Sequence, residues 1–172
     1  SAPPFTVRGN ITVTAPNTPV SWDAGSIYPI NWTYLGPIQN VTIQYSYNST
    51  TGPWANLTDS TSASSGIWNW TIAANTTLTT AGRIKVFDKD QPLTEDTSDA
   101  NFTVKGSIRV TAPNATGINL KTYDKYNITW TTVGAIGNVN ITYSNDSLSG
   151  PWKLIANNIN GSNLTYNWTI PD

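Results

Sequence analysis

Residues 36–46 read GPIQNVTIQYS, and residues 134–144 read GAIGNVNITYS, with seven of the eleven positions identical. The second stretch starts 98 residues after the first. Two further segments recur at the same offset, and they are GPW (52–54 and 150–152) and NWTI (69–72 and 167–170). Self-similarity at a fixed period is the signature of a repeated structural unit, so the chain contains a tandem repeat.

The length and the pattern of the repeat predict an all-β fold. A unit of 98 residues is close to the size of an immunoglobulin-like sandwich. Short stretches rich in Val, Ile, Thr, Tyr and Trp alternate with Gly, Pro, Asn and Ser breakers, and no stretch sustains a helical period. We therefore expect tandem immunoglobulin-like or fibronectin-like antiparallel β-sandwiches with almost no helix. The strands expected in the first unit are 10–15, 27–34, 41–47, 54–57, 67–72, 83–87 and 101–104.

The repeat also predicts the domain boundaries. Residues 9–105 make one complete unit. Residues 106–172 make a second unit, which lacks counterparts of the last two expected strands of the first. Residues 1–8 precede both units and form a separate terminal stretch.

The terminal stretch resembles the end of a unit. Phe5, Thr6 and Val7 have the same sequence as residues 102–104. The stretch is therefore either the last strand of a preceding unit or a donor strand that inserts into a neighbouring subunit by main-chain hydrogen bonds.

The order of six sequence segments resembles the order found in a known family. These segments are ITVTAP (11–16), YPINWT (28–33), NVTIQYS (40–46), IWNWTI (67–72), AGRIKVFD (81–88) and ANFTV (100–104). Their order is similar to the immunoglobulin-like domain of Ser/Thr-rich cell-surface proteins, which occurs in fungal cell-wall glycoproteins and in archaeal and bacterial surface proteins. The resemblance covers residues 10–104 and again 107–171. The resemblance implies that the chain is part of a spacer, a stalk or a cell-wall component.

The composition excludes several classes of function. The chain has no Cys, His or Met, so the usual zinc, haem and iron–sulfur ligands and a Ser–His–Asp triad are missing. A net charge of −1 with only 11% charged residues does not provide a basic surface for nucleic acid. No apolar run reaches the length of a membrane span. We expect no enzymatic activity, no cofactor, no metal, no nucleic-acid partner and no membrane insertion in this segment.

Acceptor sequons for N-glycans are far more frequent than chance predicts. With Ser and Thr at 42 of 172 positions, the twenty Asn residues would give about five sequons at random. The chain has fifteen. One interpretation is that Asn and Thr simply alternate with core residues along strands. The other, which we favour, is glycosylation, since bulky sugars would replace charge in keeping the protein soluble and would block strand edges. The acceptors are Asn10, Asn31, Asn40, Asn48, Asn56, Asn69, Asn75, Asn101, Asn114, Asn127, Asn140, Asn145, Asn160, Asn163 and Asn167.

Tryptophan is the second unusual feature of the composition, with eight residues. Those that recur between the units and have polar neighbours are expected to anchor the sandwich cores. The expected core anchors are Trp32, Trp70, Trp130 and Trp168. The residues that could instead form an exposed sugar-stacking surface are Trp22, Trp54 and Trp68.

A cluster of charge lies at residues 88–99, where six charged side chains fall within twelve residues. The spacing differs from that of an EF-hand calcium loop, so we expect a solvated loop between strands. Calcium binding by this loop stays open as an alternative.

These features together predict a structural subunit or segment of an extracellular, N-glycosylated surface assembly, such as a filament, sheath, S-layer or stalk. Its partners would be covalent N-glycans and other copies of itself or adjacent repeats, with strand donation as one way of joining subunits. An N-glycosylation system favours an archaeal or eukaryotic source. The alternative is an adhesin or carbohydrate-binding module, which would expose a planar group of aromatic side chains.

Overall fold

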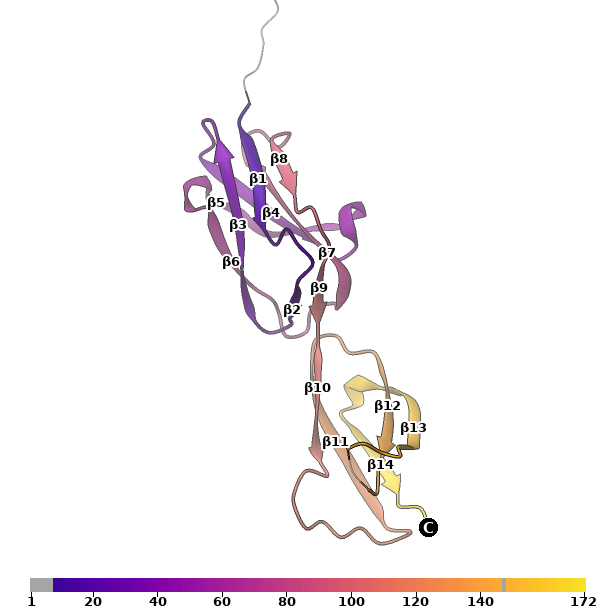
Figure 1. Cartoon of the computed structure of the whole chain (residues 1–172). Coiled ribbons are helices and arrows are strands. Elements are labelled where there is room, and N and C mark those ends of the chain that lie inside the picture. The colour runs from indigo at the N-terminus through magenta and orange to yellow at the C-terminus, as the bar shows by residue number, and fades with distance from the viewer. Residues whose placement is uncertain (1–7, 147) are drawn as a thin grey trace, which may run out of the picture. The chain divides into compact units, whose positions relative to one another are not determined.

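The computed structural model describes residues 8–146 and 148–172 (Figure 1). The chain divides into two compact units between Lys105 and Gly106. Within the described residues the only helical elements are three 3₁₀ turns, and none of them is long or apolar enough to cross a membrane. The expected donor strand at residues 5–7 lies outside the described residues. The all-β expectation is confirmed.

Unit 1 is a sandwich of two sheets (Figure 1). The first sheet has the order β1-β3-β6, with β1 (Asn10–Ala15), β3 (Ile27–Leu35) and β6 (Ile67–Thr71). The second sheet has the order β2-β9-β7-β4-β5, with β8 paired to β7. Its strands are β2 (Ser21–Asp23), β4 (Asn40–Ser46), β5 (Trp54–Ser62), β7 (Thr79–Asp88), β8 (Glu95–Thr97) and β9 (Phe102–Lys105). All pairs are antiparallel except β2 with β9.

Side chains alternate between the core and the solvent along these strands. In β1, Ile11 and Val13 are buried and their neighbours Asn10, Thr12 and Thr14 are exposed. This alternation follows from the two-residue period of a strand, and it explains why Thr and Asn dominate the outer surface.

Some elements differ from the sequence expectation. The strands β2 and β8 were not predicted, because three residues are too few to show a period. The strand β5 extends to Ser62, well beyond the expected end at residue 57. Its second half is polar and lies at the edge of the sheet, so no alternation with apolar residues marks it in the sequence.

The core of unit 1 is centred on Trp32, which is 2% exposed. Its indole N–H donates a hydrogen bond to the backbone carbonyl of Ala63 at 3.1 Å. An aromatic cluster of Trp22, Trp70 and Phe102 fills the space between the sheets, with ring centroids 4.8–6.4 Å apart. Burial beside this cluster raises the pKa of Tyr45 to about 12. Tyr45 and the three aromatic residues are therefore part of the buried core of unit 1.

Unit 2 has strands that correspond to β1, β3, β4, β5 and β6 of unit 1. One sheet has the order β10-β11-β14 and the other contains β12 and β13. The indole N–H of Trp130 donates to the carbonyl of Gly161 at 2.8 Å, which repeats the Trp32 contact. The strands are β10 (Ser107–Ala112), β11 (Lys125–Val133), β12 (Asn138–Tyr143), β13 (Lys153–Asn160) and β14 (Thr165–Thr169).

The described part of unit 2 contains no counterpart of β7, β8 or β9. The sequence pattern had suggested two absent strands, and the third is the unpredicted β8. The effect on burial is large. Ile11 and Val13 are 3% and 0% exposed, whereas their counterparts Ile108 and Val110 are 48% and 50% exposed.

The paired isoleucines provide a direct test of this difference. We expect Ile11→Ala to lower the free energy of unfolding of unit 1 by about 2–5 kcal/mol, because it removes fully buried methylene groups and leaves a cavity. The matched change Ile108→Ala should alter the stability of unit 2 by no more than about 0.5–1 kcal/mol. Denaturant unfolding of the two variants measures both values. Equal losses would contradict the open face of unit 2.

Candidate functional site

The acceptor asparagines lie at the surface of both units. Thirteen of the fifteen are exposed, and only Asn31 and Asn40 are half-buried. Nine lie within strands and six in turns or loops. Residues two positions apart in a strand share a face, so most strand acceptors and their hydroxyl residues lie on the same side of the sheet. Thr42, the hydroxyl residue of the Asn40 sequon, is buried.

Among the described residues, five acceptors have a side-chain oxygen that accepts a hydrogen bond from the fold, and they are Asn56, Asn101, Asn127, Asn140 and Asn160. The Oδ1 atom of Asn101 accepts hydrogen bonds from Arg83 Nε at 2.6 Å and from Ser49 Oγ at 3.2 Å. Asn160 Oδ1 accepts from the backbone N–H and the hydroxyl of Ser162, the third residue of its own sequon. The Asn56 Oδ1 atom accepts from the side-chain amide of a residue on β4. Each contact fixes the amide plane and therefore the direction in which Nδ2 points.

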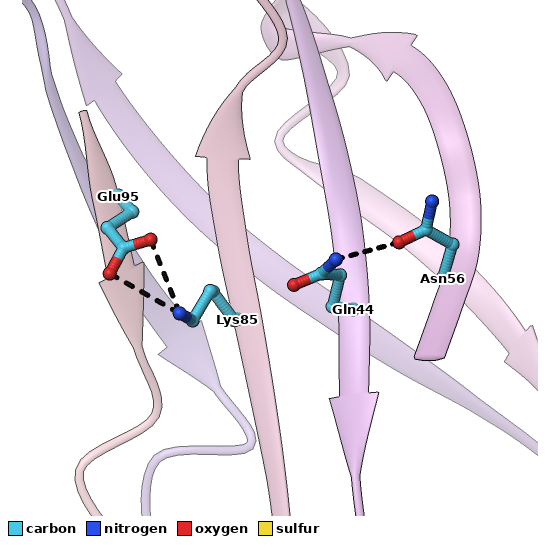
Figure 2. Close-up of polar contacts among 4 residues, drawn as sticks. All are labelled: Gln44, Asn56, Lys85 and Glu95. Carbon is cyan, nitrogen blue, oxygen red and sulfur yellow. Dashed lines mark hydrogen bonds and ion pairs between the residues drawn. The ribbon is translucent and has the colours of Figure 1, made fainter. Parts of the chain in front are cut away.

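In Asn56 and Asn167 the side-chain nitrogen Nδ2, to which a glycan would be attached, donates a hydrogen bond. Gln44 Nε2 donates to Asn56 Oδ1 at 2.8 Å (Figure 2). Asn56 Nδ2 donates to Asp59 Oδ1. Asn167 Nδ2 donates to Asn127 Oδ1 at 2.7 Å. These two asparagines are direct cross-strand partners on β11 and β14. A glycan on Asn167 would replace one of the two hydrogens of the amide nitrogen that makes this bond.

Asn31 is the least accessible of the acceptors. Its Oδ1 atom is buried and has no hydrogen-bond partner among the described residues. Its backbone pairs with both neighbours of β3, since Asn31 lies opposite Ala15 on one side and Ile67 on the other. The sequon pattern did not distinguish this central position from the exposed ones.

The expected tryptophan anchors do not all have the same environment. Trp32, Trp70 and Trp130 are buried, at 2%, 7% and 5% exposure. Trp168 is only half-buried, although it is the sequence counterpart of Trp70. No strand corresponding to β9 covers Trp168 within the described residues, and the expectation that it is a core anchor stays a prediction.

The three tryptophans considered for sugar stacking do not form one surface. Trp22 is 7% exposed and stacks on Tyr28 with centroids 4.8 Å apart. Trp54 is half-buried on β5 beneath the ammonium of Lys85, which lies 4.8 Å from its ring. Trp68 is half-buried on β6, in the other sheet. A planar platform of these three residues is absent.

Unit 2 has an apolar cleft between its two sheets. Its volume is about 270 Å³. A second cleft adjoins it, and the two share Val110, Ile128, Ile141, Thr142 and Trp152 in their walls. Trp152 is 52% exposed, whereas its counterpart Trp54 in unit 1 is half-buried. The residues that close the core of unit 1 are thus open to solvent in unit 2.

The acidic residues of the 88–99 segment contact the protein itself. The carboxylate of Asp96 accepts the backbone N–H of Val13 at 2.8 Å, which ties β8 to β1. Asp99 exchanges two hydrogen bonds with Asn17. Figure 2 shows Glu95 paired with Lys85 at 3.3 Å. Among the described residues no group of three or more acidic side chains is arranged to hold a metal ion.

The Asp96 contact should contribute measurably to stability. We expect Asp96→Ala to destabilise unit 1 by about 1–3 kcal/mol, because the part-buried N–H of Val13 loses its acceptor. The control is Asp90→Ala, which changes an exposed carboxylate in the same segment and should have little effect. Thermal unfolding with and without millimolar calcium measures both contributions. A calcium-dependent rise in melting temperature that Asp96→Ala abolishes would show that the segment binds the ion instead.

Comparisons with known proteins include a weak structural similarity. No family model matches the chain, and a comparison with curated proteins found no match. The chain is similar to the solved fibronectin(III)-like modules of Clostridium thermocellum CbhA, with 15% sequence identity and a TM-score of 0.34. The similarity covers 94% of this chain and 80% of that one. These values do not place the chain in a family.

Proposed function

We propose that this chain is a segment of an extracellular structural assembly, built from repeated β-sandwich units and covered by N-glycans. Its role is mechanical and not catalytic. The assembly is a filament, sheath, S-layer or stalk of the kind to which Ser/Thr-rich surface proteins with immunoglobulin-like domains contribute. The observation that carries the proposal is the exposure of thirteen of the fifteen acceptor asparagines.

The surface chemistry supports a glycan coat. The net charge is −1 and only 11% of the residues are charged, so electrostatic repulsion between copies is weak. The edge strands β1, β5 and β6 of unit 1 carry Asn, Thr or Ser and no Lys, a residue that commonly prevents edge pairing. Sugars attached to these asparagines would supply both the hydration and the steric barrier that charge supplies elsewhere.

The repeat supports a mechanical role. Each unit has its own core with the same indole-to-carbonyl hydrogen bond. Repeated units of this kind can be added in series. The alternative of a carbohydrate-binding module gains no support from Trp22, which is buried in the aromatic cluster.

The glycan coat is tested by the mass of the chain after expression in an N-glycosylating archaeal or eukaryotic host. We expect attached glycans at several exposed acceptors, including Asn75 and Asn101, and the lowest occupancy at Asn31. Glycopeptide mass spectrometry measures the occupancy of each site. Bare asparagine at all fifteen positions would overturn the proposal.

The cross-strand pair Asn127 and Asn167 gives a sharper prediction. Directly opposed side chains have Cβ atoms about 4.5–5.5 Å apart, so two glycans there would compete for one space. We expect Thr169→Ala, which removes the sequon at 167 and keeps both amides, to raise occupancy at Asn127.

The matched control for this competition is Thr71→Ala in unit 1. It removes the sequon at Asn69, whose cross-strand partner is Pro29 and not an acceptor. This change should leave the occupancy of every other site unchanged. Unaltered occupancy of Asn127 in the Thr169→Ala variant would show that the two sites are independent.

A further inference from the structure

The outer face of the first sheet in unit 1 has an apolar patch, formed by Ile27, Pro29 and Ile67. All three residues are exposed, with Ile27 at 62% and Ile67 at 48%. They come from the neighbouring strands β3 and β6 (Figure 1). Single exposed apolar residues are common on protein surfaces, but a group of adjacent ones is a candidate contact surface.

The acceptor Asn69 lies in the middle of this patch. Its direct cross-strand partner is Pro29. Ile67 precedes it by two positions and therefore shares its face of β6, while Ile27 is its diagonal neighbour on β3. The side chain of Asn69 makes no hydrogen bond with another described residue, so its amide nitrogen is not engaged in the fold as that of Asn167 is.

The backbone pairing brings Asn69 close to the patch. The N–H of Ile72 donates to the carbonyl of Ser26 at 2.9 Å. Hydrogen-bonded and non-hydrogen-bonded pairs alternate in an antiparallel ladder, so the pair of Pro29 and Asn69, three positions further along, is non-hydrogen-bonded. Such a pair has Cα atoms about 4.5 Å apart and side chains closer together than in the other kind of pair.

The same positions in unit 2 are polar. The counterparts of the three patch residues are Lys125, Asn127 and Thr165. Asn167, the counterpart of Asn69, pairs with Asn127 in the same register. The sheet therefore forms without apolar side chains at these positions, and the patch of unit 1 needs an explanation other than the fold.

We propose that the glycan on Asn69 lies over the apolar patch, with a C–H face of its first sugar against Ile27, Pro29 and Ile67, and so stabilises unit 1. This role rests on the proposed glycan coat and assigns a structural contact to one of its sites. A pyranose ring has hydroxyl groups at its rim and C–H groups on its faces, so it covers apolar side chains while its rim stays hydrated. Since the sugar is attached within the patch, the contact costs little of the translational freedom that a separate partner would lose.

A second copy of the chain is a poorer occupant of the patch. A stable protein interface takes about 20–30 residues from each side, and this patch has only three apolar side chains. A glycan on Asn69 would also keep a second copy away from them.

The contact is tested by comparing the 172-residue chain from an N-glycosylating host with the same chain from a bacterial host that lacks N-glycosylation. Thr71→Ala removes the sequon at Asn69. The unglycosylated chain measures the cost of the substitution itself. In the glycosylated chain the melting temperature of unit 1 should fall by at least about 3 °C more than that, because the patch also loses its cover.

Two controls separate this contact from a general effect of glycans. Ile27→Lys with Ile67→Thr installs the residues of unit 2 and keeps the sequon. In that background Thr71→Ala should cost the same in both hosts. Thr77→Ala removes the sequon of Asn75, an exposed acceptor in the turn after β6, and should also cost the same in both hosts. Nuclear Overhauser contacts between sugar protons and the methyl groups of Ile27 and Ile67 report the packing directly.

Glycopeptide mass spectrometry at Asn69 separates the outcomes. If Asn69 is occupied and Thr71→Ala costs the same in both hosts, the contact is refuted and the glycan coat stands. A bare Asn69 beside occupied acceptors elsewhere also refutes the contact alone, whereas bare asparagine at all fifteen positions refutes both. Self-association of the glycosylated chain that Ile27→Lys with Ile67→Thr abolishes would show that a second copy covers the patch instead.

Discussion

The hydrogen bond from a buried indole to a backbone carbonyl links the two sheets of each unit. Trp32 lies in the first sheet of unit 1, and its acceptor Ala63 follows β5 of the second sheet, 31 residues later. Trp130 and Gly161 repeat the contact at the same separation. A satisfied indole can be fully buried, and so a large ring can occupy the centre of the sandwich without a polar penalty. Since both units make this bond, it does not depend on β7 to β9.

The sequence was sufficient to predict the strands that have a full period. The repeat located Trp32 and Trp130, and the alternation of Asn, Thr and apolar residues gave the strand positions in unit 1. It could not give β2 and β8, whose three residues each are fixed by pairing with strands distant in the chain. The contact between Asp96 and Val13 joins residues 83 positions apart, so no local pattern reveals it.

The sequence was sufficient to predict which residues are candidate glycan acceptors and core tryptophans, but it did not show how buried each of them is. Sequons are visible in the sequence, yet only the structure separates Asn31, with its buried oxygen, from the exposed acceptors. Trp70 and Trp168 have the same local sequence, and they differ in burial because burial depends on strands that lie elsewhere in the fold. Local sequence determines which face of a strand is apolar, and the surrounding strands determine whether that face is covered.

The long separation between β1 and its covering strands has a consequence for a chain that emerges from a ribosome or an export channel. The residues that close the face of unit 1 come after its first six strands in the chain. Until they emerge, the early part of unit 1 has the same set of strands as unit 2, apart from the short β2. Closing long loops is slow compared with forming local hairpins, so such an intermediate would persist with its apolar face open. The apolar face of a partly emerged unit 1 would then be exposed, as Ile108 and Val110 are in unit 2.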